Sequence, residues 1–257
     1  MIVHPHAQRT GGGTIRNRIL AGGFGQDRVY SRMFVKNFKH WPKLTDEDLR
    51  GYLAYTDHAD YCELPLGRKC LPIVSLRHPV YRAISLYHFV RRKETHEFHR
   101  LATRESLEDF YRTGSRINPR YFRNVQVSCI CAHADARLAL EYIRTKYLAV
   151  GFTSHLDDFA QALSGIFGWS GIQVERKTAD AVRYDAQITP KFRDMVLGQN
   201  EEDSILFEAM IRGEPYYIPR TSISRAINRR AKRARDRSLA LARGARRRIG
   251  RLLLLPT

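Results

Sequence analysis

The stretch "HAQRTGGGT", residues 6–14, follows a short β-leaning run, "IVHPHA" (residues 2–7), and leads into "IRNRIL", which favours a helix. A glycine-rich turn between a strand and a helix lets backbone N–H groups converge on an anion, and the helix N-terminus adds partial positive charge. The order therefore predicts a phosphate-binding loop and a helix over residues 14–22. Three glycines alone are equally typical of a turn that binds nothing.

The side chains of this loop narrow the choice of ligand. Arg9 and the hydroxyls of Thr10 and Thr14 would supplement the backbone cradle. No Gly-Lys-Ser/Thr sequence closes the loop, so it does not meet the pattern of the nucleotide triphosphatases. ATP is therefore not the ligand that the loop predicts.

A second strand-to-helix junction follows at residues 70–92. "CLPIVSL" (70–76) is a continuous apolar run typical of a buried parallel strand, and "PVYRAISLYHFVRR" (79–92) has helical spacing. Arg77 ends the strand, and Ser85 lies eight residues later, about two turns into the helix. A guanidinium fork and a hydroxyl can hold a second phosphate. Two anion sites at the carboxyl ends of neighbouring strands suit a nucleotide phosphorylated at both ends of its ribose.

The rest of the chain alternates in the same way. "YLAVGF" (147–152) has the character of a short buried strand, and "KLTDEDLRGYL" (43–53) that of a partly helical stretch. Four further segments favour helices: "SLEDFYRTG", "DARLALEYIRTK", "HLDDFAQALSGIFG" and "TPKFRDMVLGQNEEDSILFEAMIRG". Strands that alternate with helices predict an α/β fold with a central, mainly parallel sheet flanked by helices.

Charge is concentrated at the C-terminal end. The chain carries a formal net charge of +18, and residues 220–251 contain 13 basic residues and one acid, Asp236. We expect a folded domain over residues 1–218 and a basic, partly helical or disordered tail over 219–257. Such a tail suits an anionic membrane surface, an acidic glycan or nucleic acid, and it is equally typical of a solvated extension.

Other features set expectations about environment and metals. No run approaches the roughly 18 apolar residues that span a bilayer, and "MIVHPHAQ" lacks the pattern of a signal peptide, so we expect a cytoplasmic protein, with peripheral membrane contact through the tail. "CICAH" (129–133) fits no common zinc spacing, so we expect buried reduced thiols and no metal. Trp41 and Trp169 are expected in core packing more than in sugar stacking.

Both junctions resemble motifs of the sulfotransferases. "HAQRTGGGTIR" is similar to their 5′-phosphosulfate loop, especially the His-Ile-Gln-Lys-Thr-Gly-Gly-Thr-Thr form of heparan sulfate 6-O-sulfotransferases. "LRHPVYRAISLYHFVRR" resembles their 3′-phosphate motif, Leu-Arg-Asp-Pro-Val-x-Arg-x-x-Ser. The resemblance implies a P-loop NTPase-like sulfotransferase fold and 3′-phosphoadenosine 5′-phosphosulfate (PAPS) as co-substrate. The implied binding residues are Gln8, Arg9, Thr10, Gly11, Gly12, Gly13, Thr14, Arg77 and Ser85.

The resemblance continues in patches to about residue 212. "DHADYCEL" (57–64) is similar to the His-Ala-Asp-Trp-Thr-Glu-Leu stretch of the 6-O enzymes, which implies that His58 is the catalytic base. "NVQVSCI" matches a further stretch and places Asn124 and Gln126, while "KTADAVRYD" and "QNEEDSILFEAM" echo a loop, thought to cover adenine, and a helix near the family's C-terminal end. Without the resemblance, His58 is one of ten histidines, most of which must be surface or packing residues. His6 would be a substitute base or a loop-packing residue.

Arg9 departs from the family pattern, which has lysine at this position in contact with the bridging oxygen of the phosphosulfate. Arginine keeps the charge and offers more donors, but its planar fork differs in geometry and it cannot give up a proton. We expect activity to survive, although a lowered rate or a degenerate site stays open. Arg77 and Ser85 would otherwise be an ordinary strand-end charge and a helix-face serine. Arg82 could be a solvated residue of the same helix, and its role is left open.

Together these features predict a PAPS-dependent carbohydrate sulfotransferase in which His58 and Arg9 are catalytic and no metal is needed. The expected acceptor is a hydroxyl of a polysaccharide or glycolipid, and the oligomeric state is left open. One alternative is a kinase or other phosphotransferase, which would call for a Gly-Lys-Ser/Thr loop end and carboxylates for Mg²⁺. The other is a nucleic-acid- or polyanion-binding protein with a degenerate fold. Nucleic acid would explain the charge but would leave both phosphate motifs without a purpose.

Overall fold

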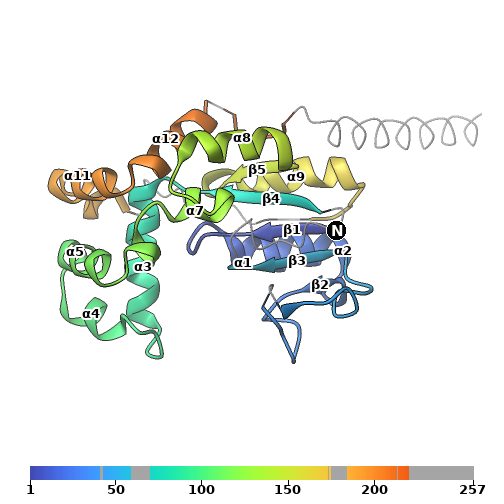
Figure 1. Cartoon of the computed structure of the whole chain (residues 1–257), viewed down its shortest axis with the longest axis horizontal. Coiled ribbons are helices and arrows are strands. Elements are labelled where there is room, and N and C mark those ends of the chain that lie inside the picture. The colour runs from blue at the N-terminus through green and yellow to red at the C-terminus, as the bar shows by residue number, and fades with distance from the viewer. Residues whose placement is uncertain (41–42, 59–69, 173, 175–183, 213, 220–257) are drawn as a thin grey trace, which may run out of the picture.

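The computed structural model describes residues 1–40, 43–58, 70–172, 174, 184–212 and 214–219 (Figure 1). Their centre is a six-stranded sheet in the order β2-β3-β1-β4-β5-β6. Neighbouring strands are parallel except β5 and β6, which are antiparallel. The expected α/β architecture is confirmed. The strands are β1 (Ile2–Pro5), β2 (Val29–Tyr30), β3 (Ala54–Asp57), β4 (Leu71–Leu76), β5 (Ala149–Phe152) and β6 (Tyr216–Tyr217).

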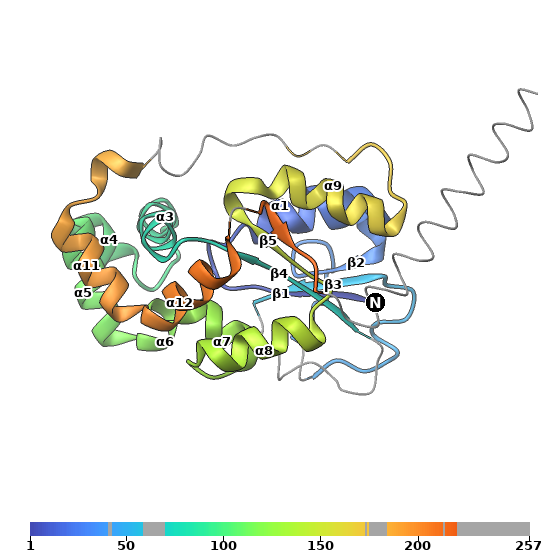
Figure 2. The same ribbon diagram turned by 90° about the horizontal axis from the view of Figure 1, so that it is seen from above.

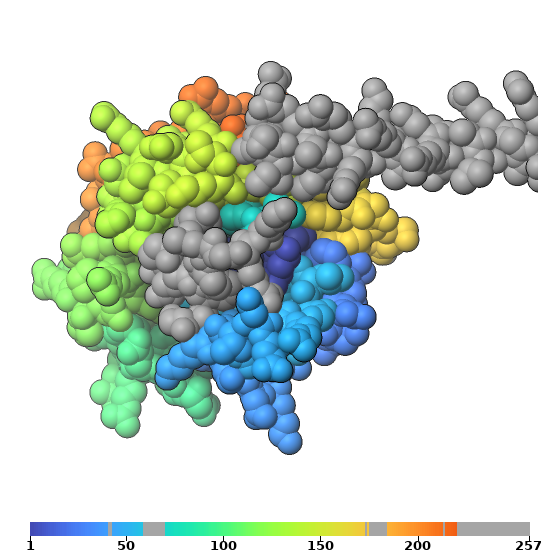
Figure 3. Space-filling view, turned by 45° about the vertical axis from the view of Figure 1, so that its right-hand side comes forward, coloured from blue at the N-terminus to red at the C-terminus, as the bar shows by residue number. Residues whose placement is uncertain are grey.

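Helices cover both faces of the sheet (Figure 2). On one face lie α1 (Gly12–Thr14), α2 (Ala21–Phe24) and α9 (Leu156–Phe167). On the other lie α7 (Val125–Cys131), α8 (Ala136–Lys146) and α12 (Glu201–Met210). Because both faces are covered, β1 and β4 are buried along nearly their whole length, which explains the continuous apolar run of β4. Figure 3 shows one side of the molecule from outside, with blue N-terminal segments at the lower right and the yellow-green segment that includes α8 at the upper left.

A lobe of helices lies beyond the carboxyl ends of the strands, next to α3 (Pro79–Arg92) (Figure 1). It contains α4 (His99–Arg104), α5 (Leu107–Ile117), α6 (Pro119–Phe122) and α11 (Pro190–Gln199). Apolar side chains of α3, α5, α6 and α11 form one buried cluster, including Ile84, Phe110, Phe122 and Phe192. The lobe thereby fixes α3, the helix that follows β4, in place.

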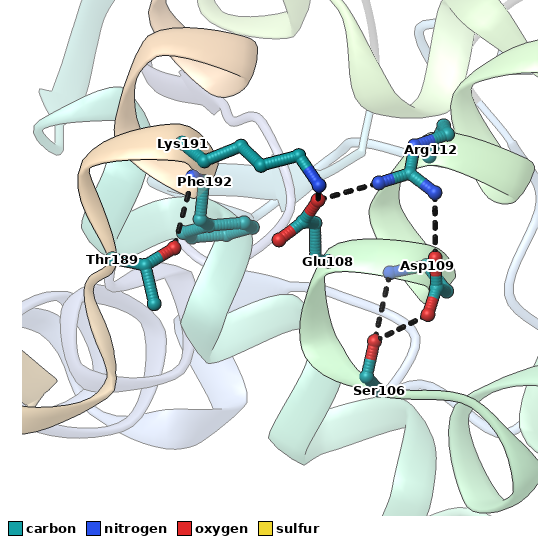
Figure 4. A network of polar contacts seen from close by, with 7 residues as sticks. All are labelled: Ser106, Glu108, Asp109, Arg112, Thr189, Lys191 and Phe192. Atoms are coloured by element: carbon teal, nitrogen blue, oxygen red, sulfur yellow. Dashed lines mark hydrogen bonds and ion pairs between the residues drawn. The ribbon is translucent and has the colours of Figure 1, made fainter.

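Polar contacts on the surface of the lobe join α5 to α11 (Figure 4). Ser106 caps α5 by accepting a hydrogen bond from the backbone N–H of Asp109 at 3.1 Å. The carboxylate of Glu108 pairs with Arg112 at 2.5 Å on its own helix and with Lys191 of α11 at 2.7 Å. Exposed ion pairs contribute about 0–1 kcal/mol each. The apolar cluster therefore dominates the cohesion of the lobe.

Two local expectations differ from the structure. The helix after the glycine loop starts earlier and ends later than residues 14–22, because α1, a π-helical segment (Ile15–Leu20) and α2 form one helical run. The partly helical stretch expected over 43–53 is wrong, since it forms turns. There the Asp48 carboxylate accepts hydrogen bonds from the N–H and hydroxyl of Thr45, and such local bonds compete with helix formation. Short 3₁₀ turns occur at Gln26–Arg28, Thr153–His155 and Asp185–Gln187.

The strand β3 was not expected from the sequence "AYTD". Its Thr56 and Asp57 are polar yet buried, and each has a partner. The ring nitrogen Nδ1 of His4 lies 3.0 Å from the Thr56 hydroxyl, and Nδ1 of His40 lies 2.8 Å from the Asp57 carboxylate. Buried polar groups are tolerated when they are hydrogen-bonded.

The structure describes some of the tryptophans and cysteines discussed above, but not all of them, and it does not describe the basic tail. Trp169 packs against Phe24 and Phe167 with ring centroids 4.7 Å and 4.9 Å apart, as expected for core packing. Cys129 and Cys131 are buried. Trp41, Cys62 and the basic tail from residue 220 lie outside the described residues. Among the helices that the structure describes, none has the length and apolar character to cross a bilayer.

Candidate functional site

The glycine loop connects β1 to α1, and its backbone depends on two of its glycines. Gly11 has φ 88°, a left-handed conformation that favours glycine. A Cβ atom on Gly12 would lie 2.2 Å from the ring of His6, so the helix can start here only without a side chain. Gly13 faces open space. The Thr10 hydroxyl donates to the carbonyl of Ala7 at 2.8 Å and is buried, so it braces the loop from within.

The side chain of Arg9 joins this loop to the β4–α3 junction. Its Nε donates to the hydroxyl of Ser85 at 3.1 Å, although the two residues are 76 positions apart. The Nη1 of Arg77 donates to the carbonyl of Arg9 at 3.1 Å. The structure therefore brings together the three residues that the sequence analysis singled out from two separate motifs.

Arg77 is held from behind by a side chain of α7. The Gln126 carboxamide accepts from the N–H of Arg77 at 2.8 Å and donates to its carbonyl at 2.8 Å. Asp203 of α12 accepts from the backbone N–H groups of Gln126 and Val127 at 3.1 Å and 2.8 Å. A chain of buried hydrogen bonds thus runs from α12 through α7 to the end of β4.

Asn124 belongs to the same chain of buried hydrogen bonds, which we call the Gln126 brace. Its backbone N–H donates to the side chain of Asn200 at 3.0 Å, and its own side-chain oxygen accepts from the backbone of Asp203 at 3.2 Å. The sequence analysis placed Asn124 and Gln126 through a resemblance but assigned them no contact. Asn200 and Asp203 were missed individually, although the patch "QNEEDSILFEAM" contains both.

Burial raises the pKa of the Asp203 carboxyl, and the nearby charge of Arg82 acts in the opposite direction. Arg82, whose role the sequence analysis left open, is completely buried and does not lie on a solvated face of α3. Its Nη2 donates to the carbonyl of Phe122 at 2.6 Å, since the end of α6 covers this side of the helix. Arg82 is therefore an interior cation of the lobe.

A cavity of about 440 Å³ opens between the two junctions. Three guanidinium groups, those of Arg9, Arg16 and Arg77, line it, and none of its described lining residues is an aspartate or glutamate. Backbone N–H groups in the first turn of a helix have no partner within that helix, and here this turn lies at the cavity wall. The cavity therefore suits an anion. The remaining lining residues are His6, Gln8, Gly11, Gly12, Gly13, Thr14, Met33, His58, Ser85, Phe89, Thr153, Ser154, Leu156 and Tyr184.

The surroundings of Arg9 lower its pKa but leave the side chain charged. Loss of hydration, and next the nearby charge of Arg77, lower the pKa of Arg9 to about 10. The guanidinium is therefore still protonated near neutral pH. A ligand anion between the two arginines would relieve the repulsion.

His58 stands at the edge of this cavity with its orientation fixed. Its Nδ1 lies 3.1 Å from the carbonyl oxygen of His6. A carbonyl oxygen only accepts, so Nδ1 carries the hydrogen and Nε2 has the lone pair in the neutral ring. His58 is exposed at the surface, but many protein atoms surround its ring. The resulting loss of hydration lowers the pKa of His58 from 6.5. The ring is therefore a neutral base at physiological pH.

The rings of His58, His6 and His4 form a row that leads into the protein interior. The His6 ring lies 4.4 Å from that of His58 and stacks on that of His4 at 4.6 Å. Burial lowers the pKa of His6 well below 6.5 and that of His4 to about 3, so both rings are neutral. The position of His6 beneath Gly12 identifies it as a loop-packing residue.

A second cavity of about 690 Å³ adjoins the first, and His6, Gln8 and His58 line both. Gln8 is held in this shared wall by a hydrogen bond from the hydroxyl of Tyr121. Burial raises the pKa of Tyr121 to about 12, so this hydroxyl keeps its proton. The rest of the lining comes from residues 119–134: Pro119, Arg120, Arg123, Asn124, Val125, Ser128, Cys129, Ala132, His133 and Ala134, together with Ala7.

Two functional candidates were missed by the sequence analysis. Tyr121, which holds Gln8, gave no signal in the sequence. Tyr184 lines the first cavity, and the guanidinium of Arg77 lies 5.7 Å from its ring centroid. It directly follows the loop "KTADAVR", whose residues 177–183 lie outside the described part of the chain, as do residues 59–64 of "DHADYCEL".

No family model matches the chain, and no curated protein matches it. Among solved structures, the chain is similar to a sulfotransferase from Alicyclobacillus acidocaldarius, with 15% sequence identity and a TM-score of 0.48. The match covers 81% of this chain and 94% of that one.

Proposed function

We propose that the protein is a sulfotransferase that moves a sulfuryl group from PAPS to a hydroxyl of a saccharide. The observation that carries the proposal is the convergence of the glycine loop with Arg77 and Ser85 in one cavity, with His58 at its edge. The glycine loop and the pair Arg77 and Ser85 would supply separate anion sites, as a ribose with 5′ and 3′ phosphates requires.

The cavity fits such a nucleotide in size and charge. Its volume of about 440 Å³ lies within the range of about 300–1,000 Å³ that is usual for small-ligand sites. Arg77 and Ser85 would hold the 3′-phosphate, and the loop residues from Gly11 to Thr14 would hold the 5′-phosphosulfate. When bound, PAPS supplies the sulfuryl group and a stable leaving phosphate.

His58 would act as the general base. Its Nε2 takes the proton from the acceptor hydroxyl, whose oxygen forms a bond to sulfur while the bond between sulfur and the 5′-phosphate oxygen breaks. 3′,5′-Adenosine bisphosphate then leaves with the electron pair of that bond. The loop N–H groups stabilise the charge that develops on the leaving phosphate. The contact between His58 and the His6 carbonyl keeps the basic nitrogen free for this transfer.

The acceptor would enter the second cavity. His58 and Gln8 line both cavities, so a hydroxyl presented from the second meets the base at the boundary with the first. The volume of about 690 Å³ suits one or more sugar units. The resemblance to the 6-O enzymes favours a primary hydroxyl of a polysaccharide or glycolipid.

The alternatives fit this site less well. A Mg²⁺-dependent phosphotransferase relies on carboxylates around the phosphates, and the described walls of the first cavity carry none. A nucleic-acid-binding module would not require a neutral histidine between two cavities. We retain the phosphotransferase as the second candidate because both activities use an anion-binding glycine loop.

The test is transfer of labelled sulfate from PAPS to a panel of polysaccharides and glycolipids. We expect His58→Gln to lower turnover by about 10²–10⁴-fold, the usual contribution of general-base catalysis. His99→Gln is a matched control, because Nδ1 of His99 also lies 3.1 Å from a backbone carbonyl, that of Val90, but His99 lines neither cavity. Label transfer from ATP in place of PAPS would favour the phosphotransferase.

The tail supports a further part of the proposal. We infer that residues 220–257 bring the enzyme to an anionic membrane surface on the cytoplasmic side, where a glycolipid acceptor would be presented. Salt-sensitive flotation with anionic vesicles, lost in a chain ending at residue 219, would support this. Equal binding to neutral and anionic vesicles would contradict it. Sulfate transfer to a water-soluble acceptor should be unchanged in the truncated chain.

A further inference from the structure

Arg9 lies in the glycine loop, but its side chain leaves that loop. Its backbone is in the left-handed region, with φ 70°, which is uncommon for a residue other than glycine. From there the side chain reaches α3, where Nε donates to Ser85 and the guanidinium carbon lies 4.6 Å from the ring centroid of Phe89. Ser85 and Phe89 are one helical turn apart, so Arg9 is held at two points along one side of α3.

Arg77 occupies the same end of the cavity. It donates to the Arg9 carbonyl, and its guanidinium carbon lies 5.7 Å from the ring centroid of Tyr184. Two cations are therefore held together, each over an aromatic ring, where the described cavity lining offers no carboxylate. A phosphate monoester carries a charge of about −1.5 to −2 and matches two guanidinium groups.

The geometry points to a specificity role for Arg9: we propose that it binds the same ligand phosphate as Arg77 and Ser85, the 3′-phosphate of the nucleotide, and not the 5′-phosphosulfate. The contact with Ser85 uses only the Nε–H of the fork, whose two NH₂ groups carry four further donors. A lysine has a single donor nitrogen, so the atom that bonded Ser85 would also have to contact the phosphate. Arg9 would thus place its charge at the 3′ end of the nucleotide.

This inference rests on the proposed function and makes a sharper claim. If Arg9 serves the 3′ end, its loss must weaken only ligands that carry a 3′-phosphate. If it serves the 5′ end, its loss must weaken all 5′-phosphorylated ligands alike.

The test is titration calorimetry of the full chain with 3′,5′-adenosine bisphosphate and with AMP, which lacks the 3′-phosphate. We expect Arg9→Met to weaken bisphosphate binding by about 10- to 100-fold, the usual loss for a charge-assisted hydrogen bond, and AMP binding by less than about 3-fold. Arg9→Lys should lie between wild type and Arg9→Met for the bisphosphate. Arg16→Met is the matched control, because Arg16 lines the cavity from the helix after the loop and should affect both ligands equally.

The outcomes separate the two claims. Equal weakening of both ligands by Arg9→Met, or no weakening of either, would overturn the role of Arg9 while leaving a nucleotide site in place. If wild type binds neither ligand, the proposed function fails and the role of Arg9 fails with it. Thermal unfolding of each variant without ligand shows that it is folded, and Arg9→Lys provides a second variant if Arg9→Met is not.

Discussion

The carboxamide of Gln126 binds both backbone polar groups of Arg77, accepting from its N–H and donating to its carbonyl, each at 2.8 Å. Arg77 stands where β4 ends, so the sheet ladder no longer serves these groups, and the Gln126 side chain takes over. The orientation of a cavity-lining arginine therefore depends on a residue 49 positions further along the chain.

Replacing Gln126 should destabilise the fold. Gln126→Met keeps roughly the side-chain volume but removes the two hydrogen bonds to the backbone of Arg77 and the side-chain contact with Asp203, at a cost of about 1–3 kcal/mol. Gln187→Met is the control, because Gln187 is exposed and pairs with His88 on the surface, so we expect a change within about 0.5 kcal/mol. Urea unfolding measures both, and equal effects would contradict the role of the brace.

The glycine loop offers a pair of adjacent substitutions. Gly12→Ala places a Cβ atom 2.2 Å from the ring of His6, and the resulting shift should cost about 1–3 kcal/mol. Gly13→Ala meets nothing within 4 Å and lies in a helical turn, so it should be neutral or stabilise by up to about 1 kcal/mol. Thermal unfolding without nucleotide compares them. A Gly13→Ala protein less stable than Gly12→Ala would show that the loop is not packed on His6.

Buried His4 should make stability depend on pH. The pKa of His4 is about 3 in the folded chain and 6.5 in the unfolded chain. Between these two pH values the unfolded state binds a proton on His4 and the folded state does not. Stability from this group is complete above pH 6.5 and is lost as the pH falls toward 3, by about 1.4 kcal/mol per pH unit at most.

The measurement is the free energy of unfolding at about pH 7 and pH 5 for wild type and His4→Asn, whose amide can still meet the Thr56 hydroxyl. We expect the variant to lose less stability between the two pH values. An identical loss in both proteins would mean that other groups cause the acid sensitivity.

His58 should give turnover an acid limb. Loss of hydration lowers the pKa of His58 from 6.5, so its Nε2 is free near neutral pH and becomes protonated only at lower pH. We expect kcat at saturating PAPS to be flat around pH 7 and to fall below the lowered pKa, and this limb should be absent from the residual activity of His58→Gln. A limb that persists in the variant would assign the base to another group.

The local parts of this site could be predicted from the sequence, and the contacts between them could not. Glycines before a helix and an apolar run before Arg77 are signals within a few residues, so both junctions were expected where they occur. The Gln126 brace and the course of the Arg9 side chain toward Ser85 depend on how distant elements pack. No spacing in the sequence encodes them.

The sheet shows the same division. Strand β4 follows from its apolar run, whereas β3 contains Thr56 and Asp57, which are compatible with burial only because His4 and His40 lie beside them. The interior position of Arg82 has the same cause, since only the packing of α6 against α3 covers it. Polar residues whose burial depends on a tertiary partner are the ones that a sequence pattern misplaces.

The central claim is that the cavity between the two junctions holds a nucleotide with phosphates at both the 5′ and 3′ positions. Its most direct test is thermal unfolding with 3′,5′-adenosine bisphosphate, AMP or ADP at moderate salt, in wild type and Arg77→Ala. At about 100 times its dissociation constant, the bisphosphate should stabilise wild type by roughly 2.7 kcal/mol, more than AMP or ADP at the same concentration, and Arg77→Ala should weaken this selectivity. Equal stabilisation by all three nucleotides, or none by the bisphosphate, would contradict the account.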